Sequence, residues 1–150
     1  MTLRIRTAQS RDLPKIVDLY GSIGDSPLDP FASVSKLREL DLSHLRIAEE
    51  DGRFAGFLYY FIHRKPWFDK DVDAYATIME LHVRPEFMGK GIGSSLLRQA
   101  LARIKSAHIK VVYIDTGDDN EVALHIYRKE GFKDFRKHIK LKLVLGSDRS

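Results

Sequence analysis

The sequence predicts a mixed α/β fold with one β-sheet and helices on both of its faces. Strands are indicated where the pattern alternates, as Leu3, Ile5 and Thr7 do with Arg4 and Arg6. Helices are indicated where apolar residues recur at intervals of three and four, most clearly over 96–104. The chain has 150 residues, so we expect one domain over 1–150 with a frayed tail over 146–150.

The expected elements follow one another along the chain. A strand over 3–7 precedes a helix that Ser10 caps and that carries Leu13, Ile16, Val17 and Tyr20. A loop over 21–30 and a helix over 34–42 lead to two strands, 45–49 and 53–62, which Asp51-Gly52 joins as a hairpin turn. After a loop over 64–72 come a strand over 74–83, a helix over 91–106, a strand over 110–116, a helix over 121–129 and a strand or hairpin over 133–145.

The composition, with 43% hydrophobic and 31% charged residues, is typical of a globular protein. No apolar run approaches the about 20 residues of a membrane span, and the N-terminus lacks the apolar core of a signal peptide. We therefore expect a cytoplasmic protein without a membrane partner. Cysteine is absent, which excludes disulfides and a cysteine nucleophile.

The net charge of +4 comes with a basic cluster over 128–142. Such a cluster is either a solvated face or a site for an anionic cofactor. Neither an RNA-binding aromatic signature nor zinc-finger spacing accompanies it, so no nucleic-acid partner is expected.

Three glycines and a lysine stand where the strand over 74–83 gives way to a helix, at Gly89, Lys90, Gly91 and Gly93. A helix N-terminus has unpaired N–H groups and partial positive charge, and glycines let a phosphate approach them. The segment is therefore either a pyrophosphate cradle or a turn that merely caps the helix. It is not a P-loop, because the residue after Lys90 is Gly91 and not Ser or Thr. Leu96 excludes a dinucleotide fingerprint, which needs Gly or Ala there.

A second pattern follows the apolar run over 111–114 and consists of Asn120, Ala123, Leu124, Tyr127 and Gly131-Phe132. With the glycine loop, it resembles the GNAT family of N-acetyltransferases over residues 3–145. The loop pattern of that family is Arg or Gln, two residues, Gly, one residue, and Gly or Ala. It falls on Met88, Gly91 and Gly93, so that Met88, which cannot donate a hydrogen bond, stands where Arg or Gln is usual.

The resemblance implies one mixed, mostly antiparallel sheet of six to seven strands with helices on both faces. It implies direct transfer of an acetyl group from acetyl-CoA to an amine, without an acyl-enzyme or a metal. The strands over 74–83 and 110–116 would splay apart to admit the pantetheine arm, which pairs with backbone groups near Leu81 and Val83. The cofactor-binding loop would comprise Met88, Gly89, Lys90, Gly91, Ile92, Gly93 and Ser94. Asn120 would contact the pantetheine, cap the following helix, or do both.

Tyr127 is the expected general acid, because the family commonly places a tyrosine there beside the thiol. A phenol with a pKa of about 10 stays protonated and can donate, although a core tyrosine would fit the same helix. Glu80 is either a general base or a residue on the wet face of its strand, which it shares with His82. Asp115 is the rival base, or a turn residue before 116–117. His82 itself is expected to be structural or at the surface.

The amine acceptor is less defined. Loops 21–30 and 64–72 are expected to form its rim, where acidic residues would attract a cation or simply be solvated. These residues are Asp25, Asp29, Asp69, Asp71 and Asp73. Trp67 and Phe68 could stack on a substrate or pair with another protomer, which leaves a homodimer open. A polyamine, aminoglycoside, amino acid or protein N-terminus would each serve as acceptor.

Two functions follow from these residues. One is an N-acetyltransferase that acts on a primary amine of a small molecule, protein or peptide, which Glu80 and Tyr127 favour. The other is a non-catalytic module that binds coenzyme A or regulates a partner, which Met88 favours.

Overall fold

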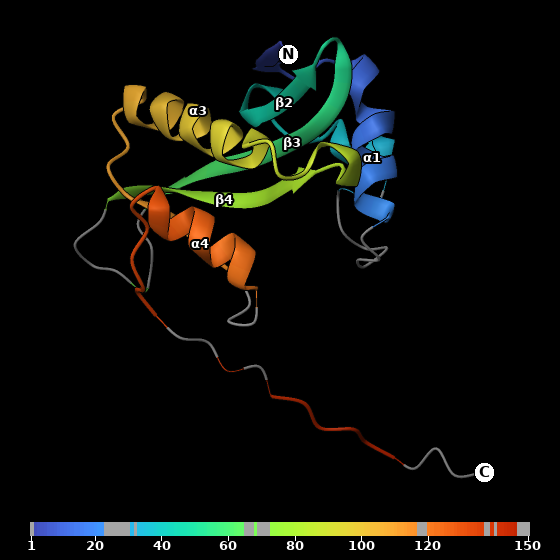
Figure 1. Cartoon of the computed structure of the whole chain (residues 1–150). Coiled ribbons are helices and arrows are strands. Elements are labelled where there is room, and N and C mark those ends of the chain that lie inside the picture. The colour runs from blue at the N-terminus through green and yellow to red at the C-terminus, as the bar shows by residue number, and fades with distance from the viewer. Residues whose placement is uncertain are drawn as a thin grey trace.

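The computed structural model describes residues 2–22, 31, 33–64, 68, 73–116, 120–136, 139 and 141–146. Its centre is a mixed sheet with the strand order β1-β2-β3-β4-β5 (Figure 1). The strands are β1 (Leu3–Thr7), β2 (Leu45–Glu50), β3 (Arg53–Arg64), β4 (Ala74–Val83) and β5 (Val112–Ile114). Neighbouring strands are antiparallel except for β4 and β5, which are parallel. The predicted mixed and mostly antiparallel sheet is therefore confirmed.

Helices cover both faces of this sheet. One face carries α1 (Leu13–Gly21) and α2 (Val34–Leu37), and the other carries α3 (Ile92–Ser106) and α4 (Glu121–Lys129). Short 3₁₀ turns span Ser10–Asp12, Leu42–His44 and Pro85–Phe87. Among the described residues, no helix has both the length and the apolar composition that crossing a bilayer requires.

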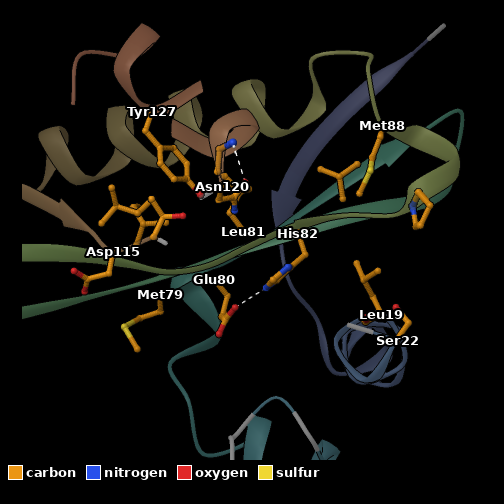
Figure 2. A pocket seen from close by; sticks show the side chains of 16 residues that line it. Leu19, Ser22, Met79, Glu80, Leu81, His82, Met88, Asp115, Asn120 and Tyr127 are labelled. Atoms are coloured by element: carbon orange, nitrogen blue, oxygen red, sulfur yellow. Dashed lines mark hydrogen bonds and ion pairs between the residues drawn. The ribbon is translucent and has the colours of Figure 1, made fainter. Parts of the chain in front are cut away.

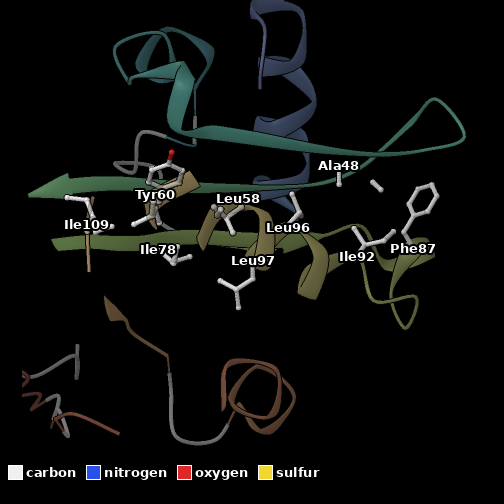
Figure 3. Close-up of a cluster of buried hydrophobic side chains, with 13 residues drawn as sticks. Ala48, Leu58, Tyr60, Ile78, Phe87, Ile92, Leu96, Leu97 and Ile109 are labelled. Atoms are coloured by element: carbon white, nitrogen blue, oxygen red, sulfur yellow. The ribbon is translucent and has the colours of Figure 1, made fainter. Parts of the chain in front are cut away.

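The alternation of side chains along the strands produces two hydrophobic cores. Phe57, at 0% exposure, belongs to the core under α1 and α2, and its neighbour Leu58, also at 0%, belongs to the core under α3. The second core also holds Leu96, Leu97 and Ile104 of α3, which confirms the predicted apolar stripe of that helix (Figure 3). The sheet is thus buried on both faces.

Several predicted elements need correction. The second helix ends at Leu37 instead of position 42, and the side chain of Asp41 then accepts hydrogen bonds from Ser43 and starts a separate turn. Ser10 does not cap α1; the N–H of Gln9 donates to Asp12 Oδ2. The fifth strand covers only Val112–Ile114.

The six to seven strands expected are not confirmed. The described sheet has five, and the described residues of 133–145 form neither a strand nor a hairpin. The hairpin between β2 and β3 is confirmed, because Asp51 and Gly52 have φ values of 51° and 80°, as a tight primed turn needs.

A bulge in β4 shapes the edge of the sheet near β5. The register shifts between Tyr59 and Tyr60, so that Tyr59 faces Glu80 while Tyr60 faces Ile78. Pairing of β4 with β5 ends at Ile78 and Ile114. Beyond this point the second half of β4 has no described strand on that side, and a space opens between the strand ends.

A buried ion pair joins β1 to the start of α1. Asp12, only 1% exposed, accepts hydrogen bonds of 2.7 Å from two guanidinium nitrogens of Arg6 and one of 2.7 Å from the N–H of Gln9. Burial alone would raise the pKa of Asp12, but these hydrogen bonds outweigh it and hold the pKa below its usual value of 3.8.

Asp12→Asn should lower the free energy of unfolding by about 2 kcal/mol at neutral pH, because it weakens the charge-assisted hydrogen bonds that the Arg6 guanidinium donates to this side chain. Because folding lowers the pKa of Asp12, its contribution is present above pH 3.8 and is lost as the pH falls through the lower, folded pKa. Urea unfolding of both proteins at pH 7 and pH 3 tests this. Equal stabilities at pH 7 would contradict it, and exposed Asp18→Asn is the control.

Candidate active site

A pocket occupies the space where β4 and β5 separate. It is lined by Glu80, Leu81, His82 and Val83 from β4, by Asp115 and Thr116 after β5, and by Asn120, Ala123 and Tyr127 of α4 and its cap. Leu19 and Ser22 at the end of α1 and Pro85 and Met88 after β4 complete the opposite wall. The site residues predicted on β4, after β5 and on α4 therefore come together in one pocket (Figure 2).

The position of Tyr127 is fixed by both ends of α4. Asn120 caps the helix, with its Oδ1 accepting from the N–H of Ala123 at 3.3 Å, and it also lines the pocket. At the other end, the N–H groups of Gly131 and Phe132 donate to the carbonyls of Arg128 and Tyr127. This Schellman arrangement needs the left-handed φ of 103° at Gly131.

The Phe132 ring then packs against the Tyr127 ring, with centroids 6.1 Å apart. Gly131 and Phe132 thus end α4 and at the same time orient the Tyr127 ring. Burial raises the pKa of Tyr127, and the negative charge of Glu80 raises it further. The phenol is therefore protonated throughout the neutral range, which fits a proton donor.

Glu80 and His82 form a hydrogen-bonded pair in the same pocket. Their positions two residues apart place both side chains on one face of β4, and Glu80 Oε2 lies 2.5 Å from His82 Nε2. Both side chains are about one-fifth exposed, at 18% and 22%. The His82 ring also contacts Tyr20 and Phe57, at centroid distances of 5.8 and 5.4 Å.

The expectation that His82 is merely structural or at the surface therefore misses its contact with Glu80. The sequence carried the relevant signal, since the two residues share a strand face. In Figure 2, Tyr127 lies on one side of the β4 ribbon, and Glu80 and His82 lie on the other. The phenol of Tyr127 and the carboxylate of Glu80 thus lie in one pocket on opposite sides of β4.

Asp115 lines the pocket directly after β5. It remains a second carboxylate within the same site. Among the acidic loop residues considered for the acceptor, Asp25, Asp29, Asp69 and Asp71 lie outside the described residues, as does Trp67. Leu19 and Ser22 were not identified from the sequence, because only the packing of α1 brings them to the pocket.

The glycine loop adjoins the pocket through Met88, which is 61% exposed. Gly89 and Gly91 both have a φ of 80°, a conformation that side chains disfavour. Gly91 is the N-cap of α3 and provides no capping side chain, so the first N–H groups of the helix have no side-chain acceptor from that position. Open space surrounds the position of a Cβ on either glycine.

Not every predicted loop residue faces the pocket. Gly89, Lys90, Gly91, Ile92, Gly93 and Ser94 are absent from its lining and form the adjoining turn and first helical turn. The Ile92 side chain is 1% exposed and belongs to the core, so only its backbone could bind a ligand. Lys90 Nζ lies 3.1 Å from Oε2 of the buried Glu50, a contact that ties the loop to β2.

A comparison with protein families identifies the chain. The model of the acetyltransferase (GNAT) family matches residues 12–132. The chain belongs to this family. The predicted family is confirmed, and with it the expectation of an acyltransferase enzyme, for which acetyl-CoA is the cosubstrate among family members.

Curated relatives agree with this assignment. The chain is 30% identical over 127 residues to the N-alpha-acetyltransferase RimI of Mycobacterium tuberculosis, covering 84% of this chain and 74% of the relative. It is 31% identical over 102 residues to streptothricin acetyltransferase A of Bacillus subtilis, covering 63% of this chain. The match spans only 54% of the length of that second relative.

Solved structures show the same fold. AAC(6')-Iy, in complex with the bisubstrate analogue CoA-S-monomethyl-acetylneamine, superposes with a TM-score of 0.77 at 19% identity, covering 96% of this chain and 99% of that chain. An acetyltransferase of Trypanosoma brucei superposes with a TM-score of 0.73 at 21% identity, covering 95% and 100%. At these identities, the likeness concerns the fold alone.

Proposed function

We propose that this protein transfers an acetyl group from acetyl-CoA directly to a primary amine of a small molecule or of a protein or peptide. One observation carries the proposal: the pocket between β4 and β5 holds Tyr127 on one side and the Glu80–His82 pair on the other. Acyl transfer to an amine needs both a proton acceptor and, for the leaving thiolate, a proton donor.

The residues present fit acetyl-CoA. The N-terminus of α3 offers backbone N–H groups that Gly91 leaves without a side-chain cap, a donor set suited to a pyrophosphate. The pairing of β4 with β5 ends at Ile78, and the residues of β4 beyond it, from Glu80 to Val83, line the pocket. Because β5 does not pair with this part of β4, the backbone of β4 can pair with an extended pantetheine arm there. Asn120 and Met88 line the same pocket.

Acetyl-CoA supplies an activated thioester, and this chain supplies proton transfers. Glu80 accepts a proton from the ammonium group of the acceptor, directly or through water, which frees the lone pair for attack. His82, bonded to Glu80, holds that carboxylate in place. Tyr127 donates its proton to the departing sulfur, since its raised pKa keeps it protonated. Asp115 is the alternative proton acceptor.

The two relatives support an amine acceptor, because one is a streptothricin acetyltransferase and the other is an N-alpha-acetyltransferase. Release of free thiol from acetyl-CoA across a panel of polyamines, aminoglycosides, amino acids and peptide N-termini tests the proposal. Thiol release that depends on one of these amines is the expected result. Binding of acetyl-CoA without release on any amine would instead support the non-catalytic module, which exposed Met88 favours.

Met88→Arg should tighten acetyl-CoA binding about fivefold, or about 1 kcal/mol, because arginine adds a charge-assisted phosphate contact. The exposure of Met88 next to the pocket leaves room for the longer side chain. Titration calorimetry measures the change, and Met79→Arg, at the other exposed methionine of the pocket, is the matched control. Unchanged or weaker binding would mean that position 88 points away from the phosphates.

Glu80→Gln should reduce the rate most at low pH, because the acceptor amine is then mostly protonated and needs a base. Raising the pH should partly restore the rate as free amine becomes abundant. Rate profiles of Glu80→Gln and Asp115→Asn, measured with the same amine between pH 6 and about 9, distinguish the two carboxylates. If Glu80→Gln keeps the parent rate while Asp115→Asn is slower, the general base is Asp115, directly after β5.

A further inference from the structure

A buried carboxylate lies beside the glycine loop. Glu50 is the last residue of β2 and is only 3% exposed. It comes two positions after Ala48, so both side chains point to the face of the sheet that α3 covers. Its Oε2 lies 3.1 Å from Lys90 Nζ, and its Oε1 has no hydrogen-bond partner within the part of the chain that the structure describes. Burying a carboxylate with so few partners costs free energy, so the contact with Lys90 requires an explanation.

The ammonium group of Lys90 makes a second contact with the sheet side of the loop. Its Nζ lies 5.6 Å from the centroid of the Phe87 ring, within the range of cation–π attraction. Phe87 is 4% exposed and belongs to the core under α3, and Figure 3 shows it at the same end of that core as Ala48. A buried carboxylate and a buried ring therefore hold the same ammonium group.

The backbone around Lys90 has little else to fix its conformation. Gly89 and Gly91 flank it, and both have a φ of 80°. Within the described chain, the backbone N–H groups of residues 89–91 find no hydrogen-bond acceptor. A segment with two glycines loses much conformational entropy when it becomes ordered. The side-chain contacts of Lys90 therefore have a large influence on how often the loop adopts this conformation.

The same pair decides what Lys90 can offer to a phosphate. If its ammonium group moved from Glu50 to a phosphate, the buried carboxylate would lose the cation that compensates its charge. Breaking a buried ion pair costs more free energy than one exposed charge-assisted hydrogen bond returns. Lys90 should therefore stay on Glu50, and a phosphate is left to the backbone N–H groups of the loop and of the first turn of α3.

We propose that Glu50 is a positioning residue for acetyl-CoA. Through Lys90 it fixes the glycine loop in the conformation whose backbone binds the pyrophosphate, and Lys90 itself is not a phosphate ligand. This inference rests on the proposed function, because it takes the glycine loop as the pyrophosphate site. The two roles of Lys90 predict opposite signs. As an anchor for Lys90, Glu50 strengthens binding, whereas it would compete with the phosphate and weaken binding if Lys90 were a ligand.

The first test is titration calorimetry of acetyl-CoA with the unmodified protein, Glu50→Gln, Lys90→Met and the double variant. Each single substitution should weaken binding about tenfold, and the double variant should bind about as weakly as either one, because both remove the same contact. Equal or tighter binding by Glu50→Gln would overturn the inference and leave the proposed function standing. No binding by the unmodified protein would overturn the proposed function as well.

Glu49→Gln is the matched control. Glu49 is the adjacent glutamate of β2, and its carboxylate pairs with Arg6 on the opposite face of the sheet. The substitution removes an ion pair from the same strand, but it should leave acetyl-CoA affinity unchanged. A loss of affinity equal to that of Glu50→Gln would show that the effect comes from general destabilisation and would overturn the inference.

The salt dependence of binding gives a test that does not require Glu50→Gln to fold. The Lys90 side chain is 43% exposed, so Lys90→Met changes a surface position. Its affinity relative to the unmodified protein should be the same at about 50 mM and about 500 mM NaCl, because a partly buried pair is screened little. A difference that disappears at high salt would identify Lys90 as a direct phosphate ligand and overturn the inference.

Hydrogen exchange and kinetics report on the loop itself. The N–H of Ser95 donates to the Gly91 carbonyl at 3.0 Å, so its exchange rate reports on the order of the loop without any ligand. Exchange should be faster in Glu50→Gln and Lys90→Met and unchanged in Glu49→Gln. In Glu50→Gln, the KM for acetyl-CoA should rise, while kcat and the KM for the amine stay near the parent values. Weakened binding with unchanged exchange at Ser95 would overturn the positioning role.

Discussion

Tyr127→Phe is expected to lower the turnover number about 10²–10³-fold, with little change in fold or in acetyl-CoA affinity. The substitution removes one hydroxyl from a half-buried ring that Phe132 and the helix end hold in place. The hydroxyl is the proposed proton donor to the thiolate, so its loss should affect the chemical step and not binding. Steady-state kinetics with the best amine of the panel, together with calorimetric binding of acetyl-CoA, separate the two effects.

Tyr60→Phe is the matched control, because Tyr60 is a buried tyrosine that stacks on His44 outside the pocket. It should leave turnover near that of the unmodified protein. Since burial raises the pKa of Tyr127, the donor should remain protonated to above about pH 10, and no loss of rate from its ionisation is expected below that value. Turnover of Tyr127→Phe at the parent rate would show that the thiolate leaves without this acid.

Gly91→Glu should abolish measurable binding of acetyl-CoA. The new carboxylate would stand at the N-cap of α3, where its negative charge repels a phosphate from the N–H groups proposed to bind it. The φ of 80° at Gly91 adds backbone strain, and that strain alone is worth roughly 1–2 kcal/mol. Calorimetry measures binding, and thermal unfolding measures the strain.

Two controls separate charge from strain. Gly91→Asn tolerates the left-handed conformation without adding charge and should keep most of the affinity. Gly52→Glu introduces the same residue at the same φ of 80° in the hairpin turn between β2 and β3. It should lower the melting temperature without affecting binding. Full affinity in Gly91→Glu would contradict the assignment of the loop as the pyrophosphate site.

Much of the fold could be predicted because local patterns specify it. The strand over 74–83 and the helix over 121–129 have the predicted bounds, since alternation and helical spacing are properties of neighbouring residues. The second helix was predicted too long because Asp41 and Ser43 form a competing turn. The final strand was predicted from a genuine alternation, but a strand also needs a partner, which the described single chain does not provide.

The candidate site was also predictable from the sequence only in part. The sequence by itself determined the glycine loop and the pattern from Asn120 to Phe132, because helix caps and left-handed glycines depend on residues a few positions apart. The tertiary structure decided that Tyr127 and Glu80 share a pocket, that Glu80 bonds His82, and that Lys90 is tied to Glu50. These relations depend on where the pairing of β4 with β5 ends and on how the helices pack against the sheet. Such long-range packing follows from the whole chain and cannot be read from any one segment of it.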